Sequence, residues 1–315
     1  MAMNSSRNFP IKLSFFDQEN LCQSVFSSDG PYWHLCTPDL SEIIFAGDDI
    51  FKVGVTLFGL CARCYTDVKV ITFQIMTTHI HAVLAGDESR CKEMFVMFRK
   101  LLARYFKKIG RVVNLSQFEC KLFPITDLKG LRNRIVYDNR NGYLVCPDDT
   151  PFTYKWGANS FYFNREVRFR HQERMHEMKF RSKRSLLHSH KLDNQKGLWI
   201  VDGSMSPVCF CDIAFGESLF RDARHYFYAV SKEIESYKEV AEEVGDSLYY
   251  TDDELFSVVC TICNSDYAGQ QATLLPKNDK ISLSRRLHYD YNASNKQIAR
   301  LLRLDISVVN SLYPH

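Results

Sequence analysis

The stretch Asp67-Val-Lys-Val-Ile-Thr-Phe-Gln-Ile-Met-Thr-Thr-His-Ile-His-Ala-Val-Leu84 decides the fold of the first half of this chain. Residues 67–76 alternate and are rich in β-branched side chains, which is typical of a strand. A second apolar, β-prone run covers residues 79–84, and only Thr77 and Thr78 separate the two runs. So short a connection predicts that the two strands pair as an antiparallel hairpin.

The flanking segments supply the other elements of one domain. Apolar spacing predicts helices over residues 48–64 and 88–108 and strands over residues 32–37 and 112–123. A further helix is expected to begin near Asp127 and to end at Gly142, because glycine often follows the last helical turn. This order predicts an antiparallel sheet with helices packed on one face, which is the α+β class.

Two histidines mark the second strand of the hairpin. Successive side chains of a strand point to opposite faces, so His79 and His81 share one face while Ile80 points toward a core. Two imidazoles on one face can present two nitrogens to one metal ion. The alternative is an ordinary strand with two half-exposed histidines.

The helix expected from Asp127 carries a phenol and an amide at a useful spacing. Tyr137 and Asn141 are four residues apart, so one helical turn places them on the same face. An amide oxygen is a metal ligand and a phenol is a nucleophile. Tyr143 is the rival nucleophile, but it follows Gly142 and has no acid or amide one turn further on, so Tyr137 is favoured.

Three segments resemble one protein family in order and in spacing. Residues 76–81, Met-Thr-Thr-His-Ile-His, resemble the Met-Pro-Asn-His-Val-His element of the REP-associated tyrosine transposases, a branch of the single-tyrosine HUH transposases. Residues 135–141 resemble the Tyr-x-x-x-Asn helix of that family, and residues 147–156 are similar to its Pro-x-x-Tyr-x-Trp segment. The resemblance implies a ferredoxin-like HUH nuclease fold, with the histidines on a central strand and the tyrosine helix lying across them.

The resemblance also implies a function, a metal-dependent transposase or endonuclease that cleaves and rejoins single-stranded DNA. Tyr137 would attack a phosphate and form a 5′-phosphotyrosine intermediate, and His79, His81 and Asn141 would hold Mg²⁺ or Mn²⁺. The expected partner is hairpin-forming single-stranded DNA, and a homodimer is among the assemblies allowed. Two alternatives stay open. One is a domesticated DNA-binding protein without cleavage activity, and the other is a replication initiator or relaxase of the wider HUH class.

Composition bounds these hypotheses without deciding between them. The chain has 315 residues, 45% of them hydrophobic, and a net charge of +3 that is too small to indicate nucleic-acid binding by itself. No long apolar run or N-terminal leader is visible, so a cytoplasmic protein without membrane association is expected. Eleven cysteines without regular spacing favour reduced thiols. The pairs Cys61/Cys64 and Cys260/Cys263 have zinc-ligand spacing, but buried thiols on helices are the better interpretation.

We expect residues 1–163 to form the HUH domain, 164–200 a basic linker and 201–315 a helical C-terminal domain. The linker is basic with interleaved aromatic residues, which is typical of a surface where phosphates pass and bases stack. A solvated linker is the alternative. The candidate DNA-binding residues in it are Arg165, Arg168, Arg170, Arg174, Lys179, Arg181, Lys183 and Arg184. His188-Ser-His190 repeats the His-x-His spacing, but its basic surroundings would repel a metal ion.

The chain ends in a pattern typical of a helix-turn-helix. Residues 295–312 have the required apolar spacing, and Ser307 is expected to open the second helix. Arg303 stands where the turn usually has glycine, so its backbone would have to be left-handed. Arg285 and Arg286 would supply phosphate contacts. A helical hairpin without a DNA-reading role is the alternative.

Overall fold

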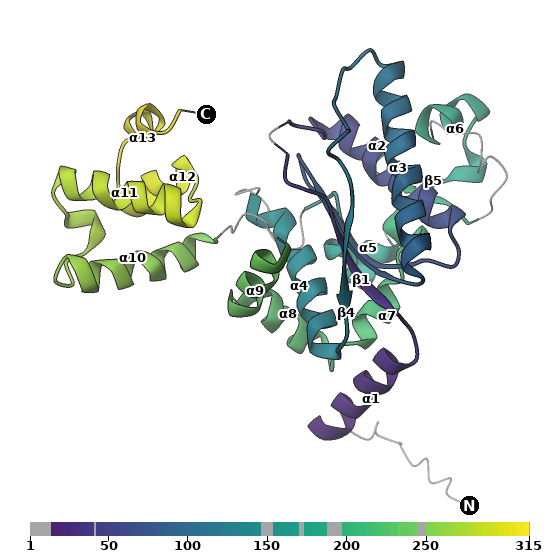
Figure 1. The fold of residues 1–315 in the computed structure, drawn as a ribbon, viewed down its shortest axis with the longest axis horizontal. Helices are drawn as coiled ribbons and strands as arrows, with labels where there is room; N and C mark the ends of the chain where they lie inside the picture. The colour runs from purple at the N-terminus through teal and green to yellow at the C-terminus, as the bar shows by residue number, and fades with distance from the viewer. Residues whose placement is uncertain are drawn as a thin grey trace, which may run out of the picture.

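Four antiparallel strands form the sheet that the sequence predicts. They are β1 (Tyr32–Cys36), β2 (Lys69–Ile75), β3 (Ile80–Ala85) and β4 (Lys121–Ile125), in the spatial order β2-β3-β1-β4. The hairpin of β2 and β3 is confirmed, with Ile75 opposite Ile80 and Gln74 opposite His81. The computed structural model describes residues 14–40, 42–145, 154–169, 173–187, 197–232, 234–244 and 250–314 (Figure 1).

Two helices with the predicted bounds connect these strands. Helix α2 (Asp48–Cys64) joins β1 to β2, and α3 (Glu88–Lys108) joins β3 to β4. Both pack on one face of the sheet, where the ring of Phe58 lies 5.4 Å from that of Phe73 and 5.5 Å from that of Phe98. The resulting β-α-β-β-α-β order with an antiparallel sheet is also the order of ferredoxin-like domains.

A helix covers the other face as well, which differs from the helices on one face that apolar spacing predicts and agrees with a tyrosine helix lying across the histidines. Helix α4 (Leu128–Val145) lies against β2 and β3, and α8 (Ala223–Lys232) and α9 (Ile234–Val244) pack against α4. Asn139 of α4 accepts a hydrogen bond from Thr72 of β2 at 2.5 Å and donates one to Tyr226 of α8 at 2.8 Å. All six residues of β3 are buried because this central strand is covered on both sides.

Helix α4 does not end at Gly142, as the sequence predicts, but continues to Val145. Gly142 does not end the helix. It allows the helix to pack closely against Tyr154 and Gln74. A Cβ atom at this position would lie 2.4 Å from the ring of Tyr154 and 2.5 Å from Nε2 of Gln74. The absence of a side chain therefore lets the segment after α4 approach the helix and β2.

Both edges of the sheet are occupied or interrupted. At β2, the N–H of Ile75 donates to the carbonyl of Trp156 at 2.8 Å, and the N–H of Ala158 donates to that of Phe73 at 3.0 Å. At the opposite edge, Pro124 of β4 has no N–H to donate. The strand predicted over residues 112–123 is wrong for most of its length, because β4 begins only at Lys121 and ends at Ile125. Val112, at the start of the predicted strand, is 95% exposed and so has no hydrophobic contact to hold it on the sheet.

The described residues between 164 and 200 form short elements instead of a plain linker. They are α5 (Arg165–Phe169), β5 (Glu173–Arg174), a 3-10 turn (Met175–Glu177), α6 (Phe180–Leu187) and the start of β6 (Trp199–Val201). Strands β5, β6 and β7 (Ser204–Met205) form a second small sheet, and α6 packs on α2. The first hydrophobic core includes residues from Cys22 to Val230. The division at residues 163 and 200 stays a prediction, and this packing favours grouping residues up to 230 with the large sheet.

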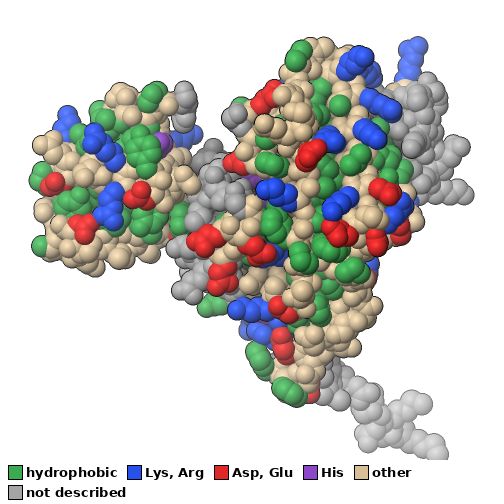
Figure 2. Space-filling view, in the orientation of Figure 1, with side chains coloured by type: hydrophobic (Ala, Val, Ile, Leu, Met, Phe, Trp, Pro, Cys, Tyr) green, Lys and Arg blue, Asp and Glu red, His purple; other side chains and the backbone are tan. Residues whose placement is uncertain are grey.

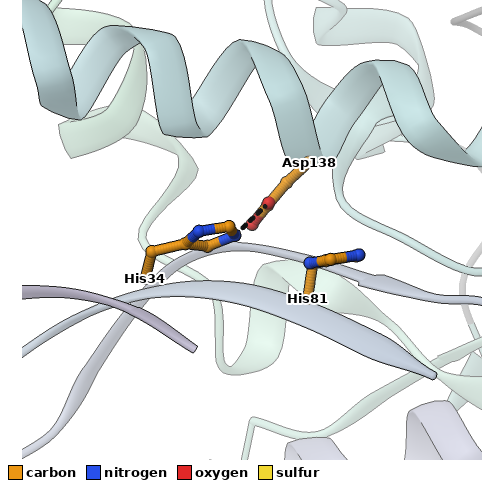
Figure 3. A group of neighbouring side chains, drawn as sticks. All are labelled: His34, His81 and Asp138. Atoms are coloured by element: carbon orange, nitrogen blue, oxygen red, sulfur yellow. Dashed lines mark hydrogen bonds and ion pairs between the residues drawn. The ribbon is translucent and has the colours of Figure 1, made fainter. Parts of the chain in front are cut away.

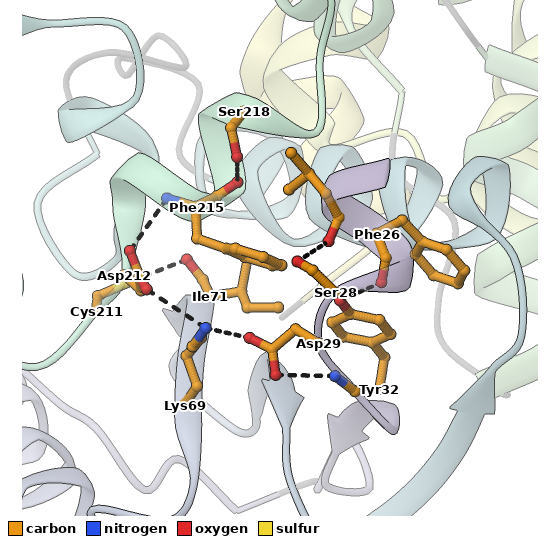
Figure 4. Close-up of polar contacts among 12 residues, drawn as sticks. Phe26, Ser28, Asp29, Tyr32, Lys69, Ile71, Cys211, Asp212, Phe215 and Ser218 are labelled. Atoms are coloured by element: carbon orange, nitrogen blue, oxygen red, sulfur yellow. Dashed lines mark hydrogen bonds and ion pairs between the residues drawn. The ribbon is translucent and has the colours of Figure 1, made fainter. Parts of the chain in front are cut away.

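A polar cluster joins α1 (Phe15–Ser27) and α7 (Ile213–Ser218) to the end of the sheet (Figure 4). Lys69 of β2 forms ion pairs with Asp29 and, at 3.7 Å, with Asp212 at the start of α7. Its ammonium also lies 4.4 Å from the centre of the Phe215 ring. The hydroxyl of Tyr32 donates to the carbonyl of Phe26 at 2.8 Å. These contacts fix three elements that are distant in sequence.

The C-terminal helices have a hydrophobic core of their own, from Tyr250 to Tyr313. They are α10 (Asp252–Asp266), α11 (Lys277–Tyr291), α12 (Asn295–Leu302) and α13 (Ile306–Leu312), and they form a separate group in Figure 1. The left-handed backbone expected at Arg303 is confirmed, with φ 49° and ψ 51°. Helix α13 begins at Ile306, not at Ser307, because the side chain of Asp305 caps it by accepting from the Ser307 N–H.

Among the helices that the structure describes, none is long and apolar enough to cross a membrane.

Candidate metal and nucleophile site

Three of the residues singled out from the sequence lie together beneath α4. The rings of His81 on β3 and Tyr137 on α4 are 5.4 Å apart and nearly perpendicular. His79 directly precedes β3, and its ring lies 4.9 Å from that of His81. The hairpin places the imidazoles on the sheet, and α4 brings the phenol across them.

A third histidine, which no sequence motif indicates, lies beside them. His34 lies on β1, where Cys36 is paired with His81 and His34 with Val83, so His34 and His81 face the same side of the sheet. Their rings are stacked 5.5 Å apart, and the ring of His34 lies 5.8 Å from that of Tyr137. His34 is fully buried. Strand alternation in the predicted strand over residues 32–37 was the available signal, but it does not say which strand neighbours β3.

Asp138 supplies a carboxylate to this group (Figure 3). Its Oδ1 lies 2.9 Å from Nε2 of His34, and its side chain points from α4 down toward the two sheet histidines. The candidate ligand atoms of His34, His81 and Asp138 all lie within 4.8 Å of one another. In the described parts of the chain, no other such group of three His, Cys, Asp or Glu side chains is found.

The geometry of this group fits a divalent cation. Ligand atoms about 2.1 Å from a metal ion lie at most about 4.2 Å apart, so small side-chain movements would close the group around an ion. Two imidazole nitrogens and one carboxylate are an established ligand set for transition metals. His34, His81 and Asp138 are therefore the residues that can hold a metal.

The other two predicted ligands lie outside this group. Nδ1 of His79 is 2.9 Å from the hydroxyl of Thr78 and 3.3 Å from Oδ1 of Asp39. A carboxylate beside the second nitrogen of a histidine is a common way to orient a metal ligand. Asn141 is buried one turn beyond Tyr137 on α4, as the spacing predicts. The metal-binding roles of His79 and Asn141 stay predictions.

The site is closed in this conformation. Tyr137, His34 and Asp138 have no exposed surface, and His81 is 1% exposed. A phosphate cannot reach the phenol unless α4 moves away from the sheet.

Ion pairs hold α4 in place from its outer side. Arg134 pairs with Glu243 of α9, and Arg140 pairs with Glu254 of α10. The Arg140 side chain is 1% exposed and that of Glu254 is 8% exposed, so their pair is excluded from water. Through Glu254, the C-terminal helices contact the helix that carries Tyr137.

The predicted DNA-binding residues differ in exposure and in whether they form ion pairs. Arg168 is half-buried, pairs with Glu217 and donates to the carbonyl of Phe161 at 2.9 Å, so it serves the fold. Arg286 pairs with Asp266. The exposed side chains are those of Arg165, Arg174, Lys179, Arg181 and Arg285, and Lys183 is half-buried. Arg174 lies over the Trp199 ring and near Glu177.

The remaining candidates lie outside the described residues. These are Arg170, the side chains of Arg184 and Tyr143, and His188 and His190. On the face seen in Figure 2, Lys and Arg side chains are mixed with Asp and Glu instead of forming one basic surface.

Comparison with known proteins gives little support of its own. No family model matches this chain, and no curated protein matches it. A solved structure of a REP-associated tyrosine transposase bound to a REP hairpin is similar to part of the chain. The similar part covers 44% of this chain and 82% of that chain, with 11% sequence identity and a TM-score of 0.33. A likeness this weak carries no inference, so the site has to be judged on its own geometry.

Proposed function

We propose that this chain is a metal-dependent strand transferase that cleaves and rejoins single-stranded DNA through Tyr137. The observation that carries the proposal is the position of the Tyr137 ring within 6 Å of the His34 and His81 rings, in contact with a group that fits a metal ion. The resemblance of residues 76–81 and 135–141 to the tyrosine transposases points the same way. A central strand carrying histidines beneath a tyrosine helix also supports the finer assignment to the HUH nuclease fold.

In this proposal His34, His81 and Asp138 hold the metal ion. Two imidazoles suit Mn²⁺ better than Mg²⁺, which prefers oxygen ligands in a strict octahedron. A bound divalent cation supplies positive charge to a non-bridging phosphate oxygen. His79 and Asn141 are the alternative ligands.

Metal binding distinguishes the two ligand sets without any cleavage assay. We expect Mn²⁺ affinity, measured by calorimetry, to fall at least tenfold in His34→Gln and to change much less in His79→Gln, because each lost ligand removes a direct bond to the ion. The reverse order would favour the set of His79, His81 and Asn141. Circular dichroism of both variants controls for folding.

Tyr137 provides the covalent step. Its hydroxyl oxygen attacks phosphorus, a P–O bond to the tyrosine forms, and the bond from phosphorus to the 3′-oxygen of the neighbouring nucleotide breaks. The phenolic proton is lost and the leaving oxygen gains one, so the products are a 5′-phosphotyrosine and a 3′-hydroxyl. The same hydroxyl, or another, reverses the step, which joins strands without a nucleotide cofactor.

The proposal requires α4 to move away from the sheet, because Tyr137, which carries the reacting oxygen, is buried. The pairs of Arg134 with Glu243 and Arg140 with Glu254 would break during this movement. The exposed Arg165 and Arg285 would contact the DNA backbone.

The decisive experiment looks for the covalent adduct. Purified protein with Mn²⁺ and labelled single-stranded hairpin oligonucleotides should give a band that survives denaturation. Tyr137→Phe should abolish the band, and Tyr143→Phe, the matched control, should retain it. An adduct that persists in Tyr137→Phe would reject the assignment.

A DNA-binding protein without cleavage activity is the second candidate. The complete burial of Tyr137 and Arg140 favours it, because a closed site is what a non-cleaving relative would keep. DNA binding without an adduct, in a protein whose α4 has been released by substitution, would support this candidate.

A further inference from the structure

We propose that a pocket beside β2 binds one nucleobase of a DNA strand and prefers bases that carry an amino group. This inference rests on the proposed function, in which DNA approaches the sheet. The pocket has a volume of about 610 Å³, which is within the usual range for small-ligand sites. Its walls come from α2, from the segment that follows α4, from α5 and from the turn between β6 and β7.

An ordered aromatic platform forms one wall. The ring of Trp156 is stacked on that of Phe51, with centroids 5.0 Å apart and planes 12° apart. Trp156 is half-buried, whereas Val55, Phe161 and Pro207 around it are buried and apolar. A fixed indole above an apolar floor suits a planar ring, and stacking of this kind binds any base.

The polar residues of the pocket select among bases. Glu166 and Asp202 are exposed carboxylates that accept hydrogen bonds and repel phosphate. They therefore favour a neutral base with an amino group, such as adenine, cytosine or guanine, over thymine. Lys155 at the same pocket offers a cation for the backbone phosphate. Oδ1 of Asn164 accepts from the N–H of Val167 at 3.2 Å, which orients its amide.

The sheet sets one part of the separation between this pocket and the candidate metal site, because the two lie on opposite faces of it. The carbonyl of Trp156 is bonded to the N–H of Ile75 on β2, and β2 pairs with β3, which carries His81. Two strand spacings amount to about 10 Å. Because Phe51 belongs to α2 whereas His81 faces α4, a strand that used both sites would pass round the β2 edge. The pocket would then bind a nucleotide several positions away from the cleaved phosphate.

Fluorescence of 2-aminopurine tests the proposal without cleavage or metal. A single-stranded oligonucleotide with one 2-aminopurine is titrated into the Tyr137→Phe protein. We expect quenching on binding, because the base stacks on Trp156. Affinity should fall about tenfold or more in Trp156→Ala and recover in Trp156→Phe, and Trp199→Ala, a half-buried tryptophan outside the pocket, should bind normally. Equal behaviour of Trp156→Ala and Trp199→Ala would overturn the proposal.

A second variant keeps the test valid if Trp156→Ala fails to fold. Asp202 already has a left-handed backbone with φ 49°, which asparagine tolerates. Asp202→Asn should reduce the preference for cytosine over thymine at the probed position, and an unchanged preference would contradict the role of the carboxylate. Free dCMP should bind far more weakly than the oligonucleotide, and equal affinity would overturn the assignment to a DNA strand. If the pocket binds DNA but wild type gives no adduct, only the strand-transfer proposal fails.

Discussion

The substitution Glu254→Gln should open the site beneath α4. Glu254 has two partners, the buried guanidinium of Arg140 and the N–H of Thr251 at the start of α10. Glutamine has nearly the same shape, and the Thr251 hydroxyl can still accept from the N–H of residue 254, so the start of α10 should survive. The change removes the negative charge beside Arg140 and one of the two acceptor oxygens.

The size of the effect follows from burial. Removing one partner of a buried ion pair costs about 3–5 kcal/mol. Because glutamine keeps one oxygen that can accept from Arg140, we expect a smaller cost than that range, about 2–3 kcal/mol. If the pair exists only while α4 is closed, the open fraction rises roughly 30- to 140-fold, since each 1.4 kcal/mol is a factor of ten.

Native-state hydrogen exchange measures the opening directly. Amides of α4 should exchange faster in Glu254→Gln, with a smaller change in α3, and the yield of the Tyr137 adduct should rise in parallel. The matched control is Asp252→Asn, which breaks an exposed pair with Arg300 on the same helical group and should cost under about 1 kcal/mol. If α3 and α4 accelerate equally, the pair stabilises the whole fold and does not hold α4 specifically.

Three further predictions concern the fold around the site. Gly142→Ala should lower the free energy of unfolding by about 1–3 kcal/mol in urea titrations, because the new Cβ meets the Tyr154 ring, and an unchanged stability would contradict this packing. Burial lowers the pKa of His225 from 6.5 to about 4. Between these two pH values the unfolded chain therefore binds more protons than the folded chain, so the free energy of unfolding falls as the pH drops. The variant His225→Gln should lose less stability over this window in pH-dependent melts. An equal loss in the two proteins would show that His225 is not the cause. Arg168→Ala should cost about 1.5–3 kcal/mol in thermal melts through loss of its pair with Glu217, and gel shifts should show unchanged DNA affinity.

Local patterns were enough to predict the central elements. The hairpin and the bounds of α2 and α3 follow from strand alternation and from continuous apolar stripes. Gly142 misled the prediction of the helix end because a glycine demanded by close packing looks the same in sequence as one that ends a helix. Apolar spacing alone predicts helices on one face of the sheet. The helix on the other face is expected only from the resemblance, which implies a tyrosine helix lying across the histidines, because no local pattern indicates that α4 covers β3.

Local sequence patterns also predict only part of the candidate site. Spacing within each element is enough to single out His79 and His81 on the hairpin and Tyr137 on the helix, and the structure brings their rings together. His34 and Asp138 join them only through the pairing of β1 with β3 and the packing of α4. Such long-range neighbours leave no mark in a single sequence.

The closed edges of the large sheet limit how copies of this chain can associate. Growth of a continuous intermolecular sheet needs a free row of N–H and C=O groups. The bonds of Ile75 and Ala158 occupy that row at one end, and Pro124 interrupts it at the other. Continuation of the large sheet from one copy to another is therefore blocked at β2 and weakened at β4, so this sheet resists the edge-to-edge stacking that begins fibrous aggregation.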